Sequence, residues 1–180
     1  MELKEKLSSF LTYLERNREK SAVMADLRCA LIPAREHRAW SHIAENGFSL
    51  ELDRERIPAL VTAFAFGCQP QRPDPADGKS RENMGDVLRR IACGDNGKDG
   101  LATYGLRFKR ILDCETAAEL ALHLKGILLL TKTRGIPVDH AQLFRDLFNW
   151  EKDDRVKQSW ANHYYSLQKK SDDADDEAGE

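Results

Sequence analysis

Basic side chains gather near the ends of predicted helices, most of them in the second half of the chain, and their chemistry is the binding of anions. Arginine and lysine neutralise phosphates and release the counterions around a nucleic-acid backbone, which strengthens binding without reading sequence. A basic residue near a helix C-terminus also complements the helix dipole, so one such residue alone does not indicate a ligand. Together they predict a nucleic-acid-binding surface with these members: Arg28, Arg89, Arg90, Arg107, Lys109, Arg110, Lys132, Arg134 and Arg145.

No recognisable catalytic or metal-binding motif accompanies these cations. The five histidines form no His-Glu-x-x-His pattern, and the sequence contains neither a Gly-x-x-x-x-Gly-Lys phosphate loop nor a Gly-x-Ser-x-Gly elbow. Four cysteines lie far apart without a Cys-x-x-Cys pair, which favours free, buried thiols: Cys29, Cys68, Cys93 and Cys114. We therefore expect a non-catalytic protein with no cofactor and no metal site.

The overall charge of −2 hides an uneven distribution of charged residues. Residues 171–180 hold six acidic side chains and no basic one, so the rest of the chain has 28 basic and 24 acidic side chains, a net charge of +4. A basic body with an acidic tail is compatible with a nucleic-acid partner. The N-terminus lacks an apolar signal core, and the most apolar segment, Leu120–Leu130, is too short to span a bilayer. We expect a cytoplasmic protein that makes no membrane contact and has a disordered acidic tail.

Apolar residues recur at steps of three and four along most of the chain, and no segment shows the two-residue alternation of a strand. The pattern predicts an all-α protein of about eight to nine helices, arranged as two small helical bundles packed together. Residues 69–80 contain three prolines and little that could be buried. They predict a linker between an N-terminal helical bundle over 1–68 and a C-terminal helical bundle over 81–170.

Capping residues, prolines and glycines set the expected helix boundaries. After the N-terminal helix, five further helices are predicted over 22–32, 34–46, 57–66, 84–93 and 101–112. Gly47 predicts a left-handed C-terminal cap, and the glycine-rich segment 94–100 predicts a flexible loop. The N-caps of the last three helices are predicted at Thr116, at Asp139, and at Asp153 or Asp154.

Aromatic residues near the C-terminus could pack in a core or stack on nucleic-acid bases. Trp160 shares an apolar stripe with Val156 and Tyr164, so we place it, together with Leu147, in the C-terminal core. Trp150 ends its predicted helix and Tyr165 lies off that stripe, so both alternatives stay open for these two residues.

Several short segments follow one another with a distinctive order and spacing over roughly residues 25–165. They are Ala25–Ala30, Ala39-Trp40, Ala63–Ala65, Asn83–Arg90, Leu106–Leu112, Gly135–Asp139 and Trp160–Tyr165. In this order they resemble the CasB family, the small subunit of the type I-E CRISPR surveillance complex Cascade. Leu106 stands where that family usually has the first arginine of a pair.

The resemblance implies a non-catalytic small subunit of a crRNA-guided DNA surveillance complex. The partners it implies are the Cascade backbone and large subunits, a second copy of the chain, crRNA-bound target DNA and the displaced non-target strand. It also implies sequence-independent contacts to the DNA backbone that stabilise the R-loop, with Arg107, Lys109 and Arg110 on the family's arginine-rich step. The alternatives are a helical nucleic-acid-binding protein outside CRISPR and an adaptor whose basic residues only pack against partners.

Overall fold

Helices are the only regular secondary structure among residues 3–51, 53, 56–66, 82–96 and 98–166, which the computed structural model describes. They are α1 Leu3–Asn17, α2 Ser21–Arg28, α3 Trp40–Glu45, α4 Arg56–Phe66, α5 Met84–Asn96, α6 Lys98–Leu112, α7 Ala117–Arg134, α8 His140–Asn149 and α9 Arg155–Tyr165. Two short 3-10 helices, Cys29–Leu31 and Glu36–Arg38, lie between α2 and α3. The prediction of an all-α fold with about eight to nine helices is confirmed. The linker predicted over 69–80 and the acidic tail predicted over 171–180 lie outside the described residues.

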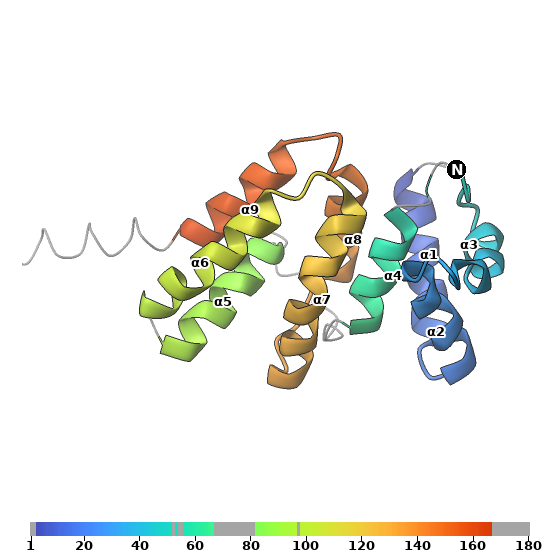
Figure 1. The fold of residues 1–180 in the computed structure, drawn as a ribbon, viewed down its shortest axis with the longest axis horizontal. Helices are drawn as coiled ribbons and strands as arrows, with labels where there is room; N and C mark the ends of the chain where they lie inside the picture. The colour runs from blue at the N-terminus through green and yellow to red at the C-terminus, as the bar shows by residue number, and fades with distance from the viewer. Residues whose placement is uncertain (1–2, 52, 54–55, 67–81, 97, 167–180) are drawn as a thin grey trace, which may run out of the picture.

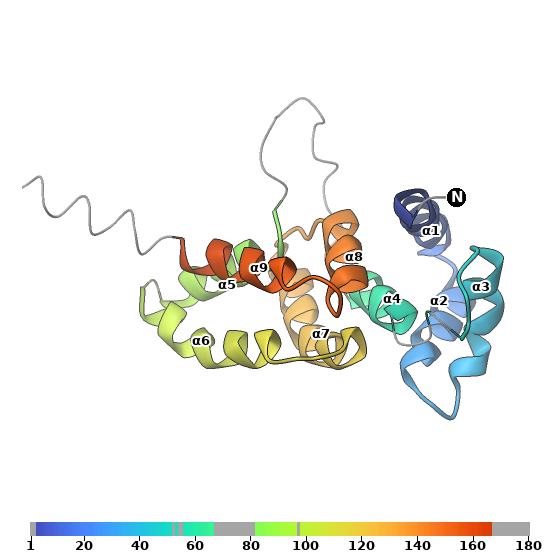
Figure 2. The ribbon, with the colours of Figure 1, turned by 90° about the horizontal axis from the view of Figure 1, so that it is seen from above.

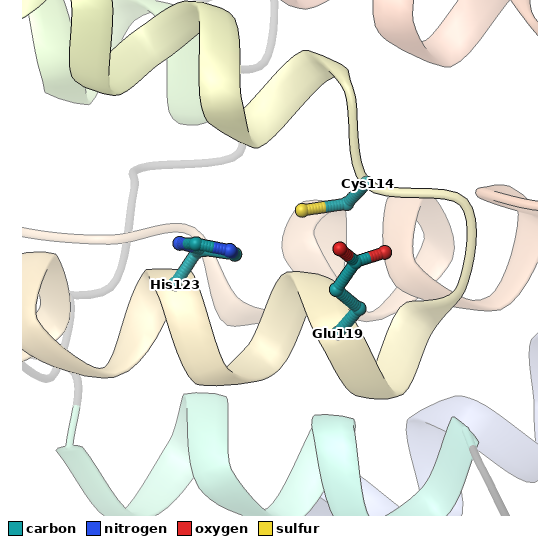
Figure 3. A group of neighbouring side chains, drawn as sticks. All are labelled: Cys114, Glu119 and His123. Atoms are coloured by element: carbon teal, nitrogen blue, oxygen red, sulfur yellow. The ribbon is translucent and has the colours of Figure 1, made fainter.

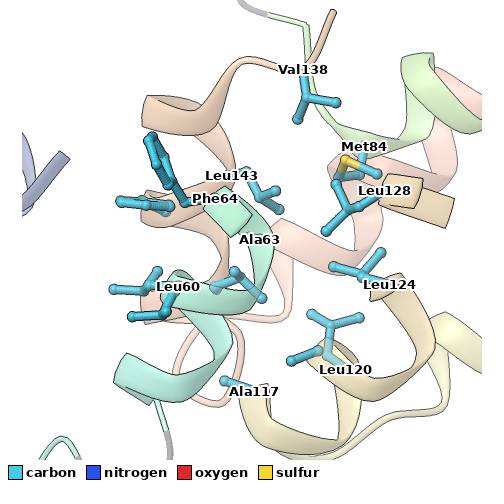
Figure 4. Close-up of a cluster of buried hydrophobic side chains, with 14 of the residues drawn as sticks. Leu60, Ala63, Phe64, Met84, Ala117, Leu120, Leu124, Leu128, Val138 and Leu143 are labelled. Carbon is cyan, nitrogen blue, oxygen red and sulfur yellow. The ribbon is translucent and has the colours of Figure 1, made fainter. Parts of the chain in front are cut away.

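The helices are spread along the long axis of the molecule, in an order that differs from their order in the sequence (Figures 1 and 2). Helices α1, α2 and α3 form one end, α5, α6 and α9 form the other, and α4, α7 and α8 lie between them. Helix α4 packs against both α7 and α8, and α1 also contacts α8. Leu60 and Phe64 of α4 belong to the same buried cluster as Leu124 of α7 (Figure 4). The division into two bundles stays a prediction, and α4 is the helix that links the residues before 69–80 to those after it.

The capping predictions are confirmed because they depend on local geometry. Thr116 and Asp139 each accept a hydrogen bond from a backbone N–H in the first turn of α7 and α8, respectively. Asp153 accepts one from the N–H of the first residue of α9, at 3.0 Å. Gly47 and Gly135 have φ values of 78° and 64°, in the left-handed region that favours glycine after a helix.

The two helices predicted over 22–32 and 34–46 are shorter in the structure than expected. Helix α2 ends at Arg28, and a 3-10 turn continues to Leu31. The second segment begins as the 3-10 helix Glu36–Arg38 and becomes α-helical only at Trp40. Hydrophobic periodicity does not distinguish an α-helix from the tighter 3-10 turns that are frequent at helix ends.

The prediction of a flexible loop over 94–100 is wrong for the described part of that segment. Helix α5 continues to Asn96, and α6 begins at Lys98. Gly100 is buried, and a Cβ atom on it would lie 1.9 Å from the carbonyl oxygen of Ala92. The backbones of α5 and α6 therefore approach each other at a position that has no room for a side chain, so this glycine serves packing rather than flexibility.

The C-terminal core is built around two tryptophans whose ring centroids lie 4.9 Å apart. Trp160 and Leu147 are fully buried, which confirms their predicted place in the core. Trp150 is also buried, and its indole N–H donates to the carbonyl of Cys114 at 2.9 Å. The indole N–H of Trp160 donates to the buried carboxylate of Asp146 at 2.7 Å. Both polar indole groups thus have partners, as buried tryptophans require.

Candidate nucleic-acid interface

The last turns of α6 present three of the predicted DNA-binding residues to solvent. Arg107, Lys109 and Arg110 are exposed, and within the described part of the chain none of their three side chains has a hydrogen-bond or ion-pair partner. Phe108 and Ile111 on the same helix are fully buried, so the packing of α6 turns its charged side chains outwards. Their cationic groups are therefore available to an anionic ligand.

Two more predicted residues, Lys132 and Arg134, lie in the last turn of α7. The side chain of Lys132 is exposed, with no hydrogen bond or ion pair to another described residue, whereas Arg134 makes a long hydrogen bond of 3.5 Å to the carbonyl of Ile91 on α5. Lys132 lies roughly 20 Å along the axis from the start of α7, at about 1.5 Å per residue. Arg107 covers part of this distance, because a Cβ atom on Gly126 would lie 2.8 Å from its Nη2 atom. The Arg107 side chain therefore lies against the middle of α7, the helix that ends with Lys132 and Arg134.

Arg89 and Arg90 on α5 are engaged within the fold. Arg89 forms an ion pair with Asp86 at 3.4 Å and donates to the backbone carbonyl of His163 on α9 at 2.8 Å. The Nδ1 atom of His163 lies 2.6 Å from the other carboxylate oxygen of Asp86. We call Asp86, Arg89 and His163 the α5–α9 contact. Arg90 pairs with Glu82 at the surface.

Arg145 and Arg28 lie on helices other than α6 and α7. Arg145 on α8 is half-buried and donates to the side chain of Gln142 at 2.8 Å. Arg28 is exposed at the end of α2, at the opposite end of the molecule from α6 (Figures 1 and 2). The structure therefore brings together only part of the predicted set, and DNA contact stays a prediction for every member.

Three exposed leucines accompany the cations, and sequence analysis did not single them out as surface residues. Leu106 on α6 is 69% exposed, and Leu122 and Leu129 on α7 are 64% and 43% exposed. The sequence signal was that α7 is apolar on more than one face, which leaves some apolar residues outside the core. We call Arg107, Lys109, Arg110, Lys132 and these leucines the α6–α7 surface. It combines positive charge with exposed apolar area.

One group of described residues beside the C-terminal end of α6 could hold a metal ion. Cys114, Glu119 and His123 place a sulfur, an oxygen and a nitrogen within 4.8 Å of one another. Burial raises the pKa of the Cys114 thiol to about 11, and the negative charge of Glu119 acts in the same direction. Sequence analysis missed the group because its three members match no spacing typical of zinc sites.

The fold defines a small all-α protein, and its α6–α7 surface presents four cationic side chains to solvent. The family model for CRISPR-associated protein Cse2 matches residues 23–165, which is most of the chain, so the chain belongs to this family. The match confirms the resemblance to CasB, and the family implies a structural, non-catalytic subunit of the CRISPR Cascade complex. No curated protein matched the chain, and no solved structure did. None of the described helices is long and apolar enough to cross a membrane.

Proposed function

We propose that this Cascade subunit stabilises the R-loop by holding DNA through sequence-independent contacts to its phosphate backbone. The α6–α7 surface makes these contacts, chiefly through Arg107, Lys109, Arg110 and Lys132. The supporting observation is that these four side chains are exposed without a hydrogen-bond or ion-pair partner among the described residues. Cations already paired within the fold would have to break those pairs before binding phosphate.

The physics of R-loop formation explains why such contacts matter. The guide–target heteroduplex is about as stable as the DNA duplex that it replaces, so protein contacts to the backbone can decide whether the R-loop stays open. Each neutralised phosphate releases counterions and strengthens binding for every sequence alike. A rigid helical subunit with exposed cationic side chains would capture the displaced strand in this way, while the guide supplies sequence specificity.

The proposal includes the partners that the family resemblance implies. The protein associates with the backbone and large subunits and with a second copy of itself, in the cytoplasm, next to crRNA-bound target DNA and the displaced non-target strand. The exposed leucines Leu106, Leu122 and Leu129 support contacts with a protein partner as well as with DNA. Apolar side chains gain nothing from contact with phosphates, whereas an apolar protein surface could bury them.

The test is the lifetime of the R-loop in an assembled complex that carries Arg107→Glu, Lys109→Glu and Arg110→Glu. We expect a shorter lifetime on every matched target, with guide loading unchanged. The log–log salt dependence of DNA binding should become shallower by about 0.7 to 0.9 for each phosphate that is no longer neutralised, or by about 2 to 3 for three phosphates.

The matched control is the triple variant Lys4→Glu, Arg16→Glu and Arg18→Glu, which makes the same charge change on exposed residues of α1 and at its C-terminal end. It should leave the lifetime close to that of the wild type. A complex that assembles normally with the α6 variant and keeps the wild-type lifetime at physiological salt would refute the proposal. Failure of assembly with that variant alone would instead support an adaptor whose basic residues pack against protein partners.

A further inference from the structure

We propose that Cys114, Glu119 and His123 form a binding site for a zinc ion at the junction of α6 and α7. The three side chains come from two sides of one turn, with Cys114 just after α6 and the other two on α7 (Figure 3). Their sulfur, oxygen and nitrogen atoms all lie within 4.8 Å of one another. The inference does not depend on DNA binding.

The backbone holds the cysteine ligand in place. The carbonyl of Cys114 accepts two hydrogen bonds, one from the indole N–H of Trp150 at 2.9 Å and one from the ammonium of Lys157 at 2.9 Å. The side chain of Cys114 is buried, so few rotamers are open to its thiol. Trp150, just after α8, and Lys157 on α9 therefore fix the backbone that carries the sulfur, and the thiol donates to the carbonyl of Arg110 at 3.3 Å. The sulfur is held in place before any metal arrives, as a preorganised site requires.

The helix places the other two ligands on the same face of α7. Glu119 and His123 are four residues apart, a separation at which neighbouring side chains on an α-helix meet. Thr116 caps α7 by accepting from the N–H of Glu119 at 3.2 Å, which fixes where the helix begins relative to Cys114. One carboxylate oxygen of Glu119 accepts from the N–H of Glu115 at 3.0 Å. The other oxygen can coordinate a metal without breaking that bond.

The ligand set favours zinc over the hard cations. Thiolate and imidazole select borderline and soft ions, whereas calcium and magnesium prefer oxygen ligands. Zinc binds sulfur at about 2.3 Å and nitrogen or carboxylate oxygen at about 2.0 to 2.2 Å. Glu119 and His123 are exposed and can make the small rotations that these distances require. Zinc would replace the thiol proton, which passes to solvent, and a water molecule would complete four-coordinate geometry.

The site would act as a clamp on the α6–α7 junction. It ties Cys114, the second residue after α6, to the first two turns of α7, the helix that carries part of the α6–α7 surface. A metal that binds the folded state and not the unfolded chain stabilises the fold by mass action. It also neutralises the Glu119 carboxylate next to the cationic end of α6.

Cobalt(II) is the probe for the test, because its absorption reports its ligands. We expect the full-length, tag-free, metal-free protein to bind one Co²⁺ ion and to gain a thiolate-to-cobalt charge-transfer band in the near ultraviolet. Added Zn²⁺ should remove that band by displacing cobalt, and it should raise the melting temperature. Cys114→Ser should abolish the band, and His123→Ala and Glu119→Gln should each weaken Zn²⁺ binding by roughly tenfold or more, the scale of losses at metal sites.

The control variant is Cys93→Ser, which removes a free, half-buried thiol on α5 and should keep the band. Circular dichroism without metal checks that each variant has folded. A wild-type protein that shows no thiolate band, or a band that survives Cys114→Ser, would overturn the proposal. So would unchanged Zn²⁺ affinity in both His123→Ala and Glu119→Gln.

Discussion

Arginines on α5 and α6 look alike in the sequence, where both groups are predicted near helix ends, but the structure places them differently: α5 continues to Asn96, so Arg89 lies in the middle of its helix. Arg89 on α5 is tied to Asp86 and to the backbone of α9. The side chains of Arg107 and Arg110 on α6 have neither a hydrogen bond nor an ion pair with any described residue. Charge counted along a sequence is therefore different from charge that is available to a ligand.

The neighbours of each helix explain the difference between the two regions. Helix α5 packs against α6 and α9, and Gly85 lets it approach α9 so closely that a Cβ atom there would lie 2.1 Å from the carbonyl oxygen of Trp160. At this close contact the Arg89 side chain reaches a backbone carbonyl of α9, that of His163, and donates a hydrogen bond to it. The outer face of α6 has no such neighbour among the described helices. The α5–α9 contact should therefore affect stability, and the α6–α7 surface should affect ligand binding.

The largest expected effect lies in the core beneath the α5–α9 contact. Trp160→Ala should lower the free energy of unfolding by about 3 to 5 kcal/mol and Leu147→Ala by about 2 to 5 kcal/mol, because both side chains are fully buried. The Trp160 change also leaves the buried Asp146 carboxylate without its indole donor. Urea unfolding measures both, and Leu122→Ala, at a side chain that is 64% exposed, is the control. Unchanged unfolding in both core variants would show that the stripe does not support the fold.

A smaller effect should come from the pH dependence of one buried histidine. His140 is buried between Phe64 and Phe144. The backbone of Ala63 lies close enough to the ring to favour its charged form, but not in the geometry of a regular hydrogen bond to either ring nitrogen. Burial lowers the pKa of His140 to about 4, from about 6.5 in the unfolded chain. Its folded-state pKa is depressed, so its stabilising contribution is present above pH 6.5 and is lost as pH falls towards 4. The loss between pH 7.5 and pH 5 should be roughly 2 kcal/mol.

The measurement is urea unfolding at a series of pH values, with His140→Leu compared with the wild type. The variant should lack this decline, while His37→Gln, at an exposed histidine, should keep it. Burial raises the pKa of Asp146, which works in the opposite direction, so the difference between proteins is the informative quantity. Equal declines in the wild type and His140→Leu would assign the pH dependence to other groups.

Local rules predicted part of this structure well. The caps at Thr116, Asp139 and Asp153 were predictable because a side-chain oxygen and a backbone N–H a few residues away decide them. Burial of Trp160 was predictable from its apolar stripe. The family was predictable because the order and spacing of several short segments carry more information than composition does.

Features that depend on contacts between distant segments were not predictable in the same way. The glycines around residue 97 suggested a loop, but Gly100 is needed because α5 and α6 approach closely, which only the packing reveals. The arginines of α5 and α6 looked alike, since the α9 carbonyl that engages Arg89 lies far away in sequence. The group of Cys114 with Glu119 and His123 depends on how the α6–α7 turn folds.

The smallest expected effect compares the two regions directly. Arg89→Ala should lower the free energy of unfolding by about 1 to 2 kcal/mol, because it removes charged hydrogen bonds from a side chain that is 26% exposed. Arg110→Ala should stay within about 0.5 kcal/mol of the wild type, as is usual for exposed residues without partners. In an assembled complex the order should reverse, with Arg110→Ala shortening the R-loop lifetime more than Arg89→Ala does. If Arg110→Ala destabilises the protein as much as Arg89→Ala, its guanidinium supports the fold and the two regions do not differ as proposed.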